Sequence, residues 1–453
     1  MYVWLARYQW WGVAPIALIM VATLGWWGTV TALRADPGAV SLRGLVVTIV
    51  VVSTVMVVFP PRHTRDVASF SIYGRIVAVH DANPYVDLPS AFADDPVYPE
   101  VGRRWVNTPS RYGPLFTGVS AIGASLLPAR PLPLRLWFQG ITLFGALGVA
   151  VLVWRRWRSP AALAFVALHP LMTLSVINGA HNDVFVGLGA LAFVMLVEKK
   201  RFAAAGFALA LAALIKLTAV LALVAAVLWL LSRRQVRGAI VAAAACVVPT
   251  LGVMAAVPGC LDAVRSAADI NVKNSLWYGV QLYFTPSSWF PVHGPGRSLH
   301  DIEQFVKTPA LALTALAVLG GVIMVLRRER ATAATANNAH PAHPGSGLAV
   351  ATAVALATFS VFPAWVMPWY LVWALPLVAT TGGLASSRIR ATMALHGSVM
   401  LCASHLRGFS TDHVDVLAVV VQFVIPFGAA IAYGTAVYQD TRMVTTDQNA
   451  AAP

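Results

Sequence analysis

Long apolar runs separated by short polar stretches dominate this chain, from a first run over about residues 11–33 to a last one over 414–433. A bilayer core is crossed by about 20 apolar helical residues, and backbone exposed to lipid must form its hydrogen bonds within its own segment. The runs therefore predict helices and no strands. We expect an all-α polytopic membrane protein, a bundle of about 13 membrane segments in one domain over residues 1–453.

The apolar run over residues 202–231 is too long for one ordinary crossing and carries a single charge, Lys216. Because basic loops flank both of its ends, we expect two helices with Lys216 near the turn between them. Half-length helices are tolerated at membrane depth only where they line a cavity. The other expected segments are 44–59, 112–128, 134–153, 161–177, 184–197, 239–257, 308–326, 347–361, 370–380 and 391–403.

Polar intervals interrupt this pattern, and the longest covers residues 59–116. We expect it to form an outer loop with short interfacial helices, the first an amphipathic helix over Asp66–Val79. Asp87–Asp95 is expected to be solvated loop. Residues 258–307 are expected to form a second outer loop, 331–346 a cytoplasmic linker and 439–453 a disordered tail.

Composition and charge agree with a membrane protein. The chain is 58% hydrophobic and 11% charged, whereas a soluble domain carries about 25% charged residues. The net charge of +14 comes largely from short basic loops at 155–158, 198–201, 233–237 and 327–330. Such loops mark the cytoplasmic side and contact anionic lipid, so nucleic-acid binding is not expected. Three scattered cysteines indicate neither a disulfide framework nor a metal site, and no cleavable signal peptide is evident.

The polar segments other than the short basic loops are expected on the opposite face of the membrane. They comprise 59–116, 178–183, Lys216, 258–307 and the aromatic stretch 365–370. If 59–116 is outside and 155–158 is inside, an odd number of crossings must separate them, but two apolar segments lie between them. Either 112–128 re-enters without crossing, or 155–158 violates the charge bias. A single site at the non-cytoplasmic surface is the reading that these groups favour.

Asp66, just after the second apolar run, can act as a general base or cap the following helix, and position alone favours the cap. His181, Asn182 and Asp183 abut an apolar helix and are either functional or, in the equally favoured alternative, supply its cap through Asn182 or Asp183. Lys216 either binds an anion, which we favour, or snorkels to the interface. Four arginines can clamp a phosphate: Arg75, Arg103, Arg104 and Arg111. For any one of them taken alone, a loop cation near lipid headgroups is the better interpretation.

Other motifs narrow the choice of chemistry. Trp365, Trp369 and Tyr370 are an ordinary interfacial belt or, less strongly, a stacking surface for a sugar. The sequence contains no Walker loop, no GxGxxG after a strand, no HExxH and no GxSxG in suitable context. ATP-driven transport, dinucleotide chemistry, zincins and the usual serine hydrolases are therefore not expected.

The motifs and their order resemble the GT-C integral-membrane glycosyltransferases, and most closely the actinobacterial polyprenol-phosphate-mannose-dependent alpha-1,6-mannosyltransferases. The resemblance covers about residues 44–435 and is carried by Asp66, Tyr73–Arg75, Asn83–Tyr85, Pro109–Phe116, Asn178–Asp183, Leu214–Thr218 and Pro368–Trp373. It implies a polyprenyl-phosphate sugar donor, a glycolipid or cell-envelope glycan acceptor, and inversion at the anomeric carbon. It also implies a multi-pass plasma-membrane enzyme with an outward-facing site and no cofactor; metal dependence stays open.

The resemblance also implies residue roles. Asp66 would be the base. Lys216, Arg103, Arg104 and Arg111 would hold the donor phosphate. Substrate contacts would come from Tyr73, Arg75, Asn83, Tyr85, Tyr112, His181, Asn182, Asp183, Lys273, Trp369 and Tyr370. Two alternatives remain open: a transporter or flippase of lipid-linked sugars, for which we find no inverted repeats, and a GT-C enzyme that uses another polyprenyl-phosphate sugar.

Overall fold

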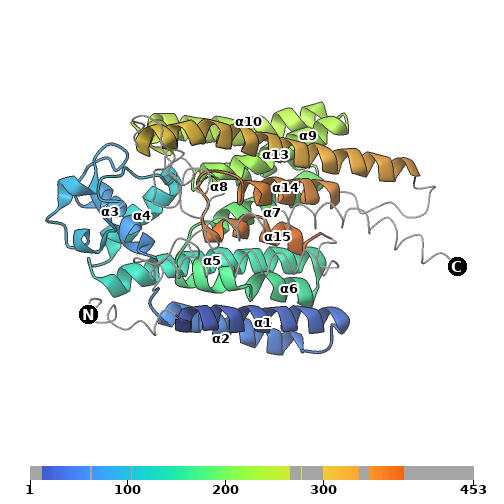
Figure 1. Cartoon of the computed structure of the whole chain (residues 1–453), viewed down its shortest axis with the longest axis horizontal. Coiled ribbons are helices and arrows are strands. Elements are labelled where there is room, and N and C mark those ends of the chain that lie inside the picture. The colour runs from blue at the N-terminus through green and yellow to red at the C-terminus, as the bar shows by residue number, and fades with distance from the viewer. Residues whose placement is uncertain are drawn as a thin grey trace, which may run out of the picture.

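The computed structural model describes residues 13–61, 64–103, 105–265, 277, 299–335 and 346–381, and within these ranges it is all-helical, without strands. This confirms the predicted all-α class. Most helices run along the long axis, while α3 and α4 gather at one end (Figure 1). The helices are α1 (Val13–Ala35), α2 (Leu42–Val58), α3 (Asp66–Ala78), α4 (Pro114–Leu126), α5 (Pro131–Trp157), α6 (Pro160–Ala167), α7 (Val184–Glu198), α8 (Phe202–Ala213), α9 (Val220–Ser232), α10 (Val236–Ala256), α11 (Cys260–Arg265), α13 (Leu299–Thr335), α14 (Ser346–Phe359) and α15 (Leu375–Ala379).

Four of the described helices, α1, α5, α10 and α13, are long and apolar enough to cross a membrane. A fifth candidate joins α6 to a π-helix over Leu171–Asn178, with a bend of 49° between them. Shorter apolar helices make up most of the rest, so the predicted count of about 13 segments is not confirmed. The predicted segments 391–403 and 414–433, the predicted tail 439–453 and most of 258–307 lie outside the described residues.

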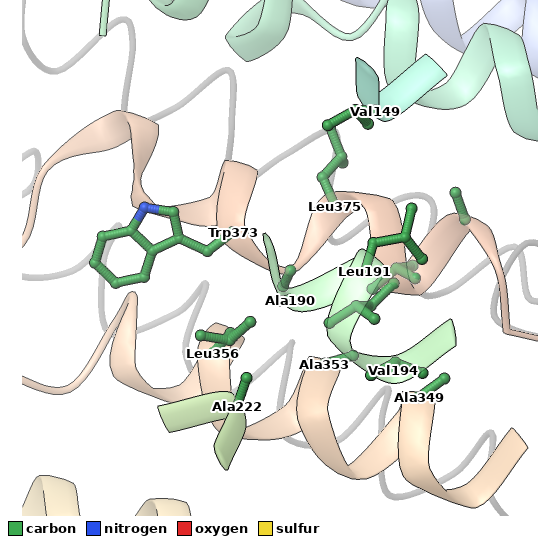
Figure 2. Packing of buried hydrophobic residues seen from close by; sticks show 14 of the residues in the cluster. Val149, Ala190, Leu191, Val194, Ala222, Ala349, Ala353, Leu356, Trp373 and Leu375 are labelled. Atoms are coloured by element: carbon green, nitrogen blue, oxygen red, sulfur yellow. The ribbon is translucent and has the colours of Figure 1, made fainter. Parts of the chain in front are cut away.

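The core surrounds α7, which packs against α5, α8 and α14. Leu191 and Val194 of α7 are fully buried and lie among alanines and aliphatic side chains of the neighbouring helices (Figure 2). Small residues allow the close approach: a Cβ built on Gly189 would lie 2.4 Å from the Cβ of Ala212 in α8. Helices in lipid associate through such close packing of small residues.

The run 202–231 forms the expected helix pair. Helix α8 ends at Ala213 and α9 begins at Val220, with Lys216 in the break and a 3₁₀ turn over Leu217–Ala219. The break leaves backbone carbonyls without helical partners, and the segment that starts α4 satisfies them. The amide of Gly113 donates to the Ile215 carbonyl at 2.9 Å, and the amide of Leu115 donates to the Leu214 carbonyl at 3.0 Å.

Helix α3 forms where predicted but is not a one-sided interfacial helix. Every residue from Ser69 to Ile76 is buried, because α4 and the 89–106 loop cover it on several sides. A Cβ on Gly74 would lie 2.3 Å from the Ser120 carbonyl oxygen, so the two helices touch through their backbones. The predicted solvated loop over Asp87–Asp95 is also wrong at its end, because the carboxylate of Asp95 is fully buried.

The basic loops are joined by ion pairs. Arg156 pairs with Glu198, which links the ends of α5 and α7, and Arg233 pairs with Glu329, which links the end of α9 to α13. Since Asp183 directly precedes α7 and Glu198 ends it, the 178–183 segment and the basic loop lie at opposite ends of that helix. Helix α13 continues to Thr335, so the expected linker does not begin at residue 331.

Candidate active site

A cavity of about 390 Å³ opens at the end of α7 that is remote from the basic loops. Its polar lining comes from the start of α3, the loop before α4, the segment before α7, the break before α9, and the segment around Tyr370. Apolar side chains of α9, α13 and α14 also line it: Val220, Leu221, Val224, Leu311 and Phe359. The cavity within the bundle is therefore lined by both ionisable and apolar side chains.

The π-helix and α5 fix the chain that leads to the cavity. The side-chain amide of Asn178 donates to the carbonyls of Met56 at 2.9 Å and Phe59 at 2.7 Å. The side-chain amide of Gln139 donates to the Asn178 carbonyl at 2.8 Å. These bonds tie the end of α2, just before Asp66, to the segment that carries His181.

Asp66 is the first residue of α3 and does not cap it. The N-cap position is Arg65, without a side-chain capping bond, so the cap reading is wrong. The Asp66 carboxylate lies 3.2 Å from Nδ1 of His181, and the two side chains are 20% and 1% exposed. The His181 ring stacks on Trp369, with centroids 3.5 Å apart. A buried imidazole held by an aromatic face thus orients a carboxylate that still reaches the cavity.

The pKa of Asp66 follows from these contacts. Burial opposes ionisation, but the hydrogen bond and charge of His181 outweigh it, with help from the Thr64 hydroxyl and the charge of Lys216. The pKa of Asp66 is consequently lowered below its ordinary value. The carboxylate is ionised at neutral pH and available to accept a proton.

Asp183 is a second carboxylate in the cavity, and one of its oxygens accepts two hydrogen bonds. Its Oδ1 accepts from Lys216 Nζ at 2.6 Å and from Trp373 Nε1 at 2.7 Å, and its side chain is 2% exposed. It occupies the N-cap position of α7 without a side-chain capping bond, so the cap alternative fails here too. Lys216 also lies 4.5 Å from the centroid of the Tyr370 ring. Asp183 and Lys216 form a fixed pair in the cavity wall.

Other polar groups complete the lining. The guanidinium of Arg111 lies over the rings of Trp105 and Trp365, 5.9 and 5.5 Å from their centroids. The Asn182 amide nitrogen and the Thr218 hydroxyl are buried lining groups without a hydrogen-bond partner in the described structure. No group of three or more His, Cys, Asp or Glu residues within the described ranges is arranged to hold a metal ion.

Comparison with known proteins identifies the chain's relatives. Residues 4–233 match the family model described as "alpha-(1->6)-mannopyranosyltransferase, N-terminal domain". The chain belongs to this family. It is also 28% identical over 172 residues to alpha-(1->6)-mannopyranosyltransferase A of Corynebacterium glutamicum, a match that covers 36% of this chain and 34% of that protein. The chain thus spans about a third of the length of this relative.

The family match runs through α9, so it includes Asp66, Arg111, Lys216 and the segment 181–183. The apolar wall from α13 and α14 lies beyond it. The resemblance inferred from the motifs is therefore confirmed at the level of the family.

The cavity brings together nine of the residues expected at the site. They are Asp66, Arg111, Tyr112, His181, Asn182, Asp183, Lys216, Trp369 and Tyr370. Arg104 and Lys273 lie outside the described residues. Arg103 is exposed and does not line the cavity.

Tyr73, Arg75, Asn83 and Tyr85 do not line the cavity but hold the loops together. Tyr73 donates to the Thr108 carbonyl at 2.8 Å, and Tyr85 donates to the Tyr112 carbonyl at 2.8 Å. The Arg75 side chain, 10% exposed, forms an ion pair at 2.9 Å with the buried Asp95.

The side chain of Asn83 also forms hydrogen bonds within the loops. Its side-chain amide donates to the Pro258 carbonyl at 2.9 Å, and its Oδ1 accepts from the Tyr85 amide at 3.0 Å. The motifs of the family resemblance selected these residues, but their contacts place them in the supporting structure rather than at the cavity.

Some lining residues were missed by the sequence reasoning, among them Trp105, Thr218 and Lys307. Lys307 directly precedes an apolar run, as Lys216 interrupts one, and that shared placement was a usable signal. Nothing in the local sequence distinguishes Trp105 from the other aromatic residues of its loop.

Proposed function

We propose that this protein is a membrane mannosyltransferase that moves mannose from a polyprenyl-phosphate donor to a hydroxyl of a glycolipid or cell-envelope glycan. The observation that carries the proposal is an ionised, partly accessible carboxylate, Asp66, in a cavity that apolar side chains of α9, α13 and α14 also line. Mannose as the sugar is supported by the family and by the name of the Corynebacterium glutamicum relative. We place the reaction at the outer face of the plasma membrane, since the cavity is at the end opposite the basic loops.

Asp66 acts as the general base. The acceptor hydroxyl gives its proton to the Asp66 carboxylate while its oxygen bonds to the anomeric carbon. The bond from that carbon to the phosphate oxygen breaks, and its electron pair leaves with polyprenyl phosphate. Attack from the face opposite the leaving group inverts the anomeric centre. His181 orients the carboxylate and stabilises its charge before transfer, and Trp369 holds the imidazole in place.

We choose Asp66 over Asp183 as the base because of the contacts and the exposure of the two carboxylates. The Asp183 side chain is 2% exposed, and protonation would remove the charge that holds Lys216, whereas the Asp66 side chain is 20% exposed and meets one imidazole. Breaking a buried charged contact costs several kcal/mol, which would add to the barrier. Asp183 therefore serves as a positioning residue that fixes Lys216.

The cations of the cavity take the donor phosphate. Arg111 is the strongest candidate, because a planar guanidinium oriented by two aromatic rings suits bidentate phosphate recognition. Lys216 and Lys307 add positive charge around the leaving group. The apolar wall of α9, α13 and α14 accommodates the lipid tail. The buried Asn182 amide and the Thr218 hydroxyl bind sugar hydroxyls, since an unpaired buried polar atom is costly.

The test is transfer in proteoliposomes that contain the full chain, polyprenyl-phosphate mannose and a mannosylated lipid acceptor. Asp66→Asn should lower turnover about 10²–10⁴-fold, the usual contribution of a general base, and leave donor binding intact. Asp94→Asn, an exposed carboxylate of the same loop system, is the matched control and should keep full activity. Transfer within tenfold of the wild type by Asp66→Asn would remove Asp66 as the base.

The donor is tested in the same vesicles. Polyprenyl-phosphate glucose and a nucleotide mannose should each transfer at least tenfold more slowly than polyprenyl-phosphate mannose. Movement of labelled donor between leaflets without an acceptor, unaffected by Asp66→Asn, would favour a flippase instead. A preference for the glucosyl donor would overturn the assignment of mannose but keep the mechanism.

A further inference from the structure

A second cavity, of about 250 Å³, lies against a different face of α3 and shares no lining residue with the first. Its walls come from Thr64–Ser71, from Pro96–Glu100 and from the start of α5. The proposed transfer reaction makes no use of it. The two cavities are separated by the first turns of the helix that carries Asp66.

The charge of this cavity is positive. Three arginines line it, Arg65, Arg130 and Arg135, and Glu100 is its only acidic lining residue in the part of the chain described. None of the ion pairs found among the described residues involves these arginines. Arg135 donates to the Val58 carbonyl at 3.2 Å, while its Nε is buried without a hydrogen-bond partner. Guanidinium groups gathered in this way match the geometry of a phosphate.

The cavity lies beside the edge of the apolar surface. Val58 at the end of α2, Leu126 at the end of α4 and Leu132 at the start of α5 are 61%, 68% and 57% exposed. Exposed aliphatic side chains next to arginines are typical of the boundary between acyl chains and headgroups. A ligand that enters here meets both lipid and positive charge.

The usual explanation of membrane-flanking arginines does not apply here. The basic loop at 155–158 ends α5, while Arg130 and Arg135 are at its beginning, a helix of 27 residues away. The positive-inside bias accounts for basic residues at one end of a spanning helix and leaves those at the other end unexplained. A specific anionic ligand accounts for them.

The walls are held in place by buried interactions. Asp95 accepts from the Val97 amide at 2.9 Å and pairs with Arg75 and His80, which fixes the turn that carries Glu100. Leu134, which precedes Arg135 in the chain, is buried and packs in the cluster that contains Val97. The cavity is therefore a built site rather than a group of free surface side chains.

We propose that this second cavity binds the phosphate of an anionic membrane lipid, with the headgroup between Arg65, Arg130 and Arg135 and the acyl chains along the exposed aliphatic residues. The proposal goes beyond the transferase function and does not depend on it. Inorganic phosphate has the same charge chemistry, and the experiment separates the two sources.

The test measures lipid binding to the full chain in detergent by native mass spectrometry. The probes are phosphatidylglycerol, phosphatidylcholine of the same chain length, and inorganic phosphate. Phosphatidylglycerol should bind the wild type at least tenfold more tightly than phosphatidylcholine, and R130Q/R135Q should lose that preference. R103Q, an exposed arginine outside the cavity, is the matched control and should keep it. E100Q removes the opposing charge and should strengthen phosphatidylglycerol binding.

Each other result counts against the proposal. An equal loss in R103Q would mean that diffuse charge, not this cavity, attracts the lipid. Unchanged preference in R130Q/R135Q would remove the site. Inorganic phosphate that binds as tightly as phosphatidylglycerol would identify a free-phosphate site instead. If R130Q/R135Q fails to fold, R130K/R135K keeps the charge, loses the guanidinium fork, and should still reduce the lipid preference.

Discussion

The pair formed by Lys216 and Asp183 gives the sharpest quantitative prediction. Lys216→Met would leave the Asp183 carboxylate, 2% exposed, with Trp373 as its remaining donor. Removal of one partner of a buried ion pair costs about 3–5 kcal/mol. Because the Lys216 side chain is 18% exposed to the cavity, we expect the lower end, about 3 kcal/mol, or roughly a hundredfold in the unfolding equilibrium.

Asp183→Asn should cost less, about 1–2 kcal/mol, because the Asn carbonyl still accepts from Trp373. Lys216 then retains its cation–π contact with the Tyr370 ring, whose centroid is 4.5 Å from Nζ. In the double variant no buried charge is left unpaired, so its cost should fall below the sum of the single costs by about 2 kcal/mol.

The assay is reversible unfolding of the purified chain in mixed micelles, followed by tryptophan fluorescence, with the double-mutant cycle built from the four proteins. Lys199→Met, an exposed lysine, is the control and should change stability by less than about 0.5 kcal/mol. Strictly additive costs, or a Lys216→Met variant as stable as the control, would refute the reasoning that this pair stabilises the cavity wall.

Further predictions concern the base, a close backbone contact and a buried carboxylate. His181→Ala should shift the acidic limb of the pH–rate profile to higher pH, because burial still raises the pKa of Asp66 while the main opposing contact is lost; an unmoved limb would contradict this. Gly113→Ala should lower the melting temperature, since its Cβ would lie 2.1 Å from the Leu214 carbonyl oxygen, a cost of about 1–3 kcal/mol. Burial opposes ionisation of Asp95, but the Val97 amide and its histidine and arginine partners lower its pKa. The contribution of ionised Asp95 to folding stability should therefore persist above the ordinary carboxyl pKa and be lost as pH falls below about 4. Asp95→Asn should remove that acid dependence from thermal melts.

The composition of the cavity was largely predictable, because its members stand at the ends of apolar runs. Asp66 follows one run, His181–Asp183 precede another, and Lys216 interrupts a third. An ionisable residue at such a place is near the membrane boundary in any packing arrangement of the helices. Several boundaries on the same side of the bilayer then come close together in a compact bundle.

The supporting residues were not separable from the site residues by the same argument. Arg75 has the sequence context of a substrate contact, yet its partner is Asp95, 20 residues away, and only the fold brings them together. Lys307 directly precedes an apolar run and was still missed, since the run alone does not show that this end of α13 reaches the cavity. Polarity locates a boundary, whereas tertiary contacts decide which polar groups face a cavity.

The cavity exists because three helical segments are irregular at the same level. The π-helix over Leu171–Asn178 ends just before His181, the break after α8 carries Lys216, and the 3₁₀ turn Pro368–Trp373 carries Trp369 and Tyr370. Irregular backbone is stable at membrane depth only where protein or a water-filled cavity surrounds it. Continuous helices would direct these side chains in a spiral around each axis, towards lipid as well as core. The interruptions thus place charged groups together inside the bundle, and they line the volume that the proposed lipid-linked donor would occupy.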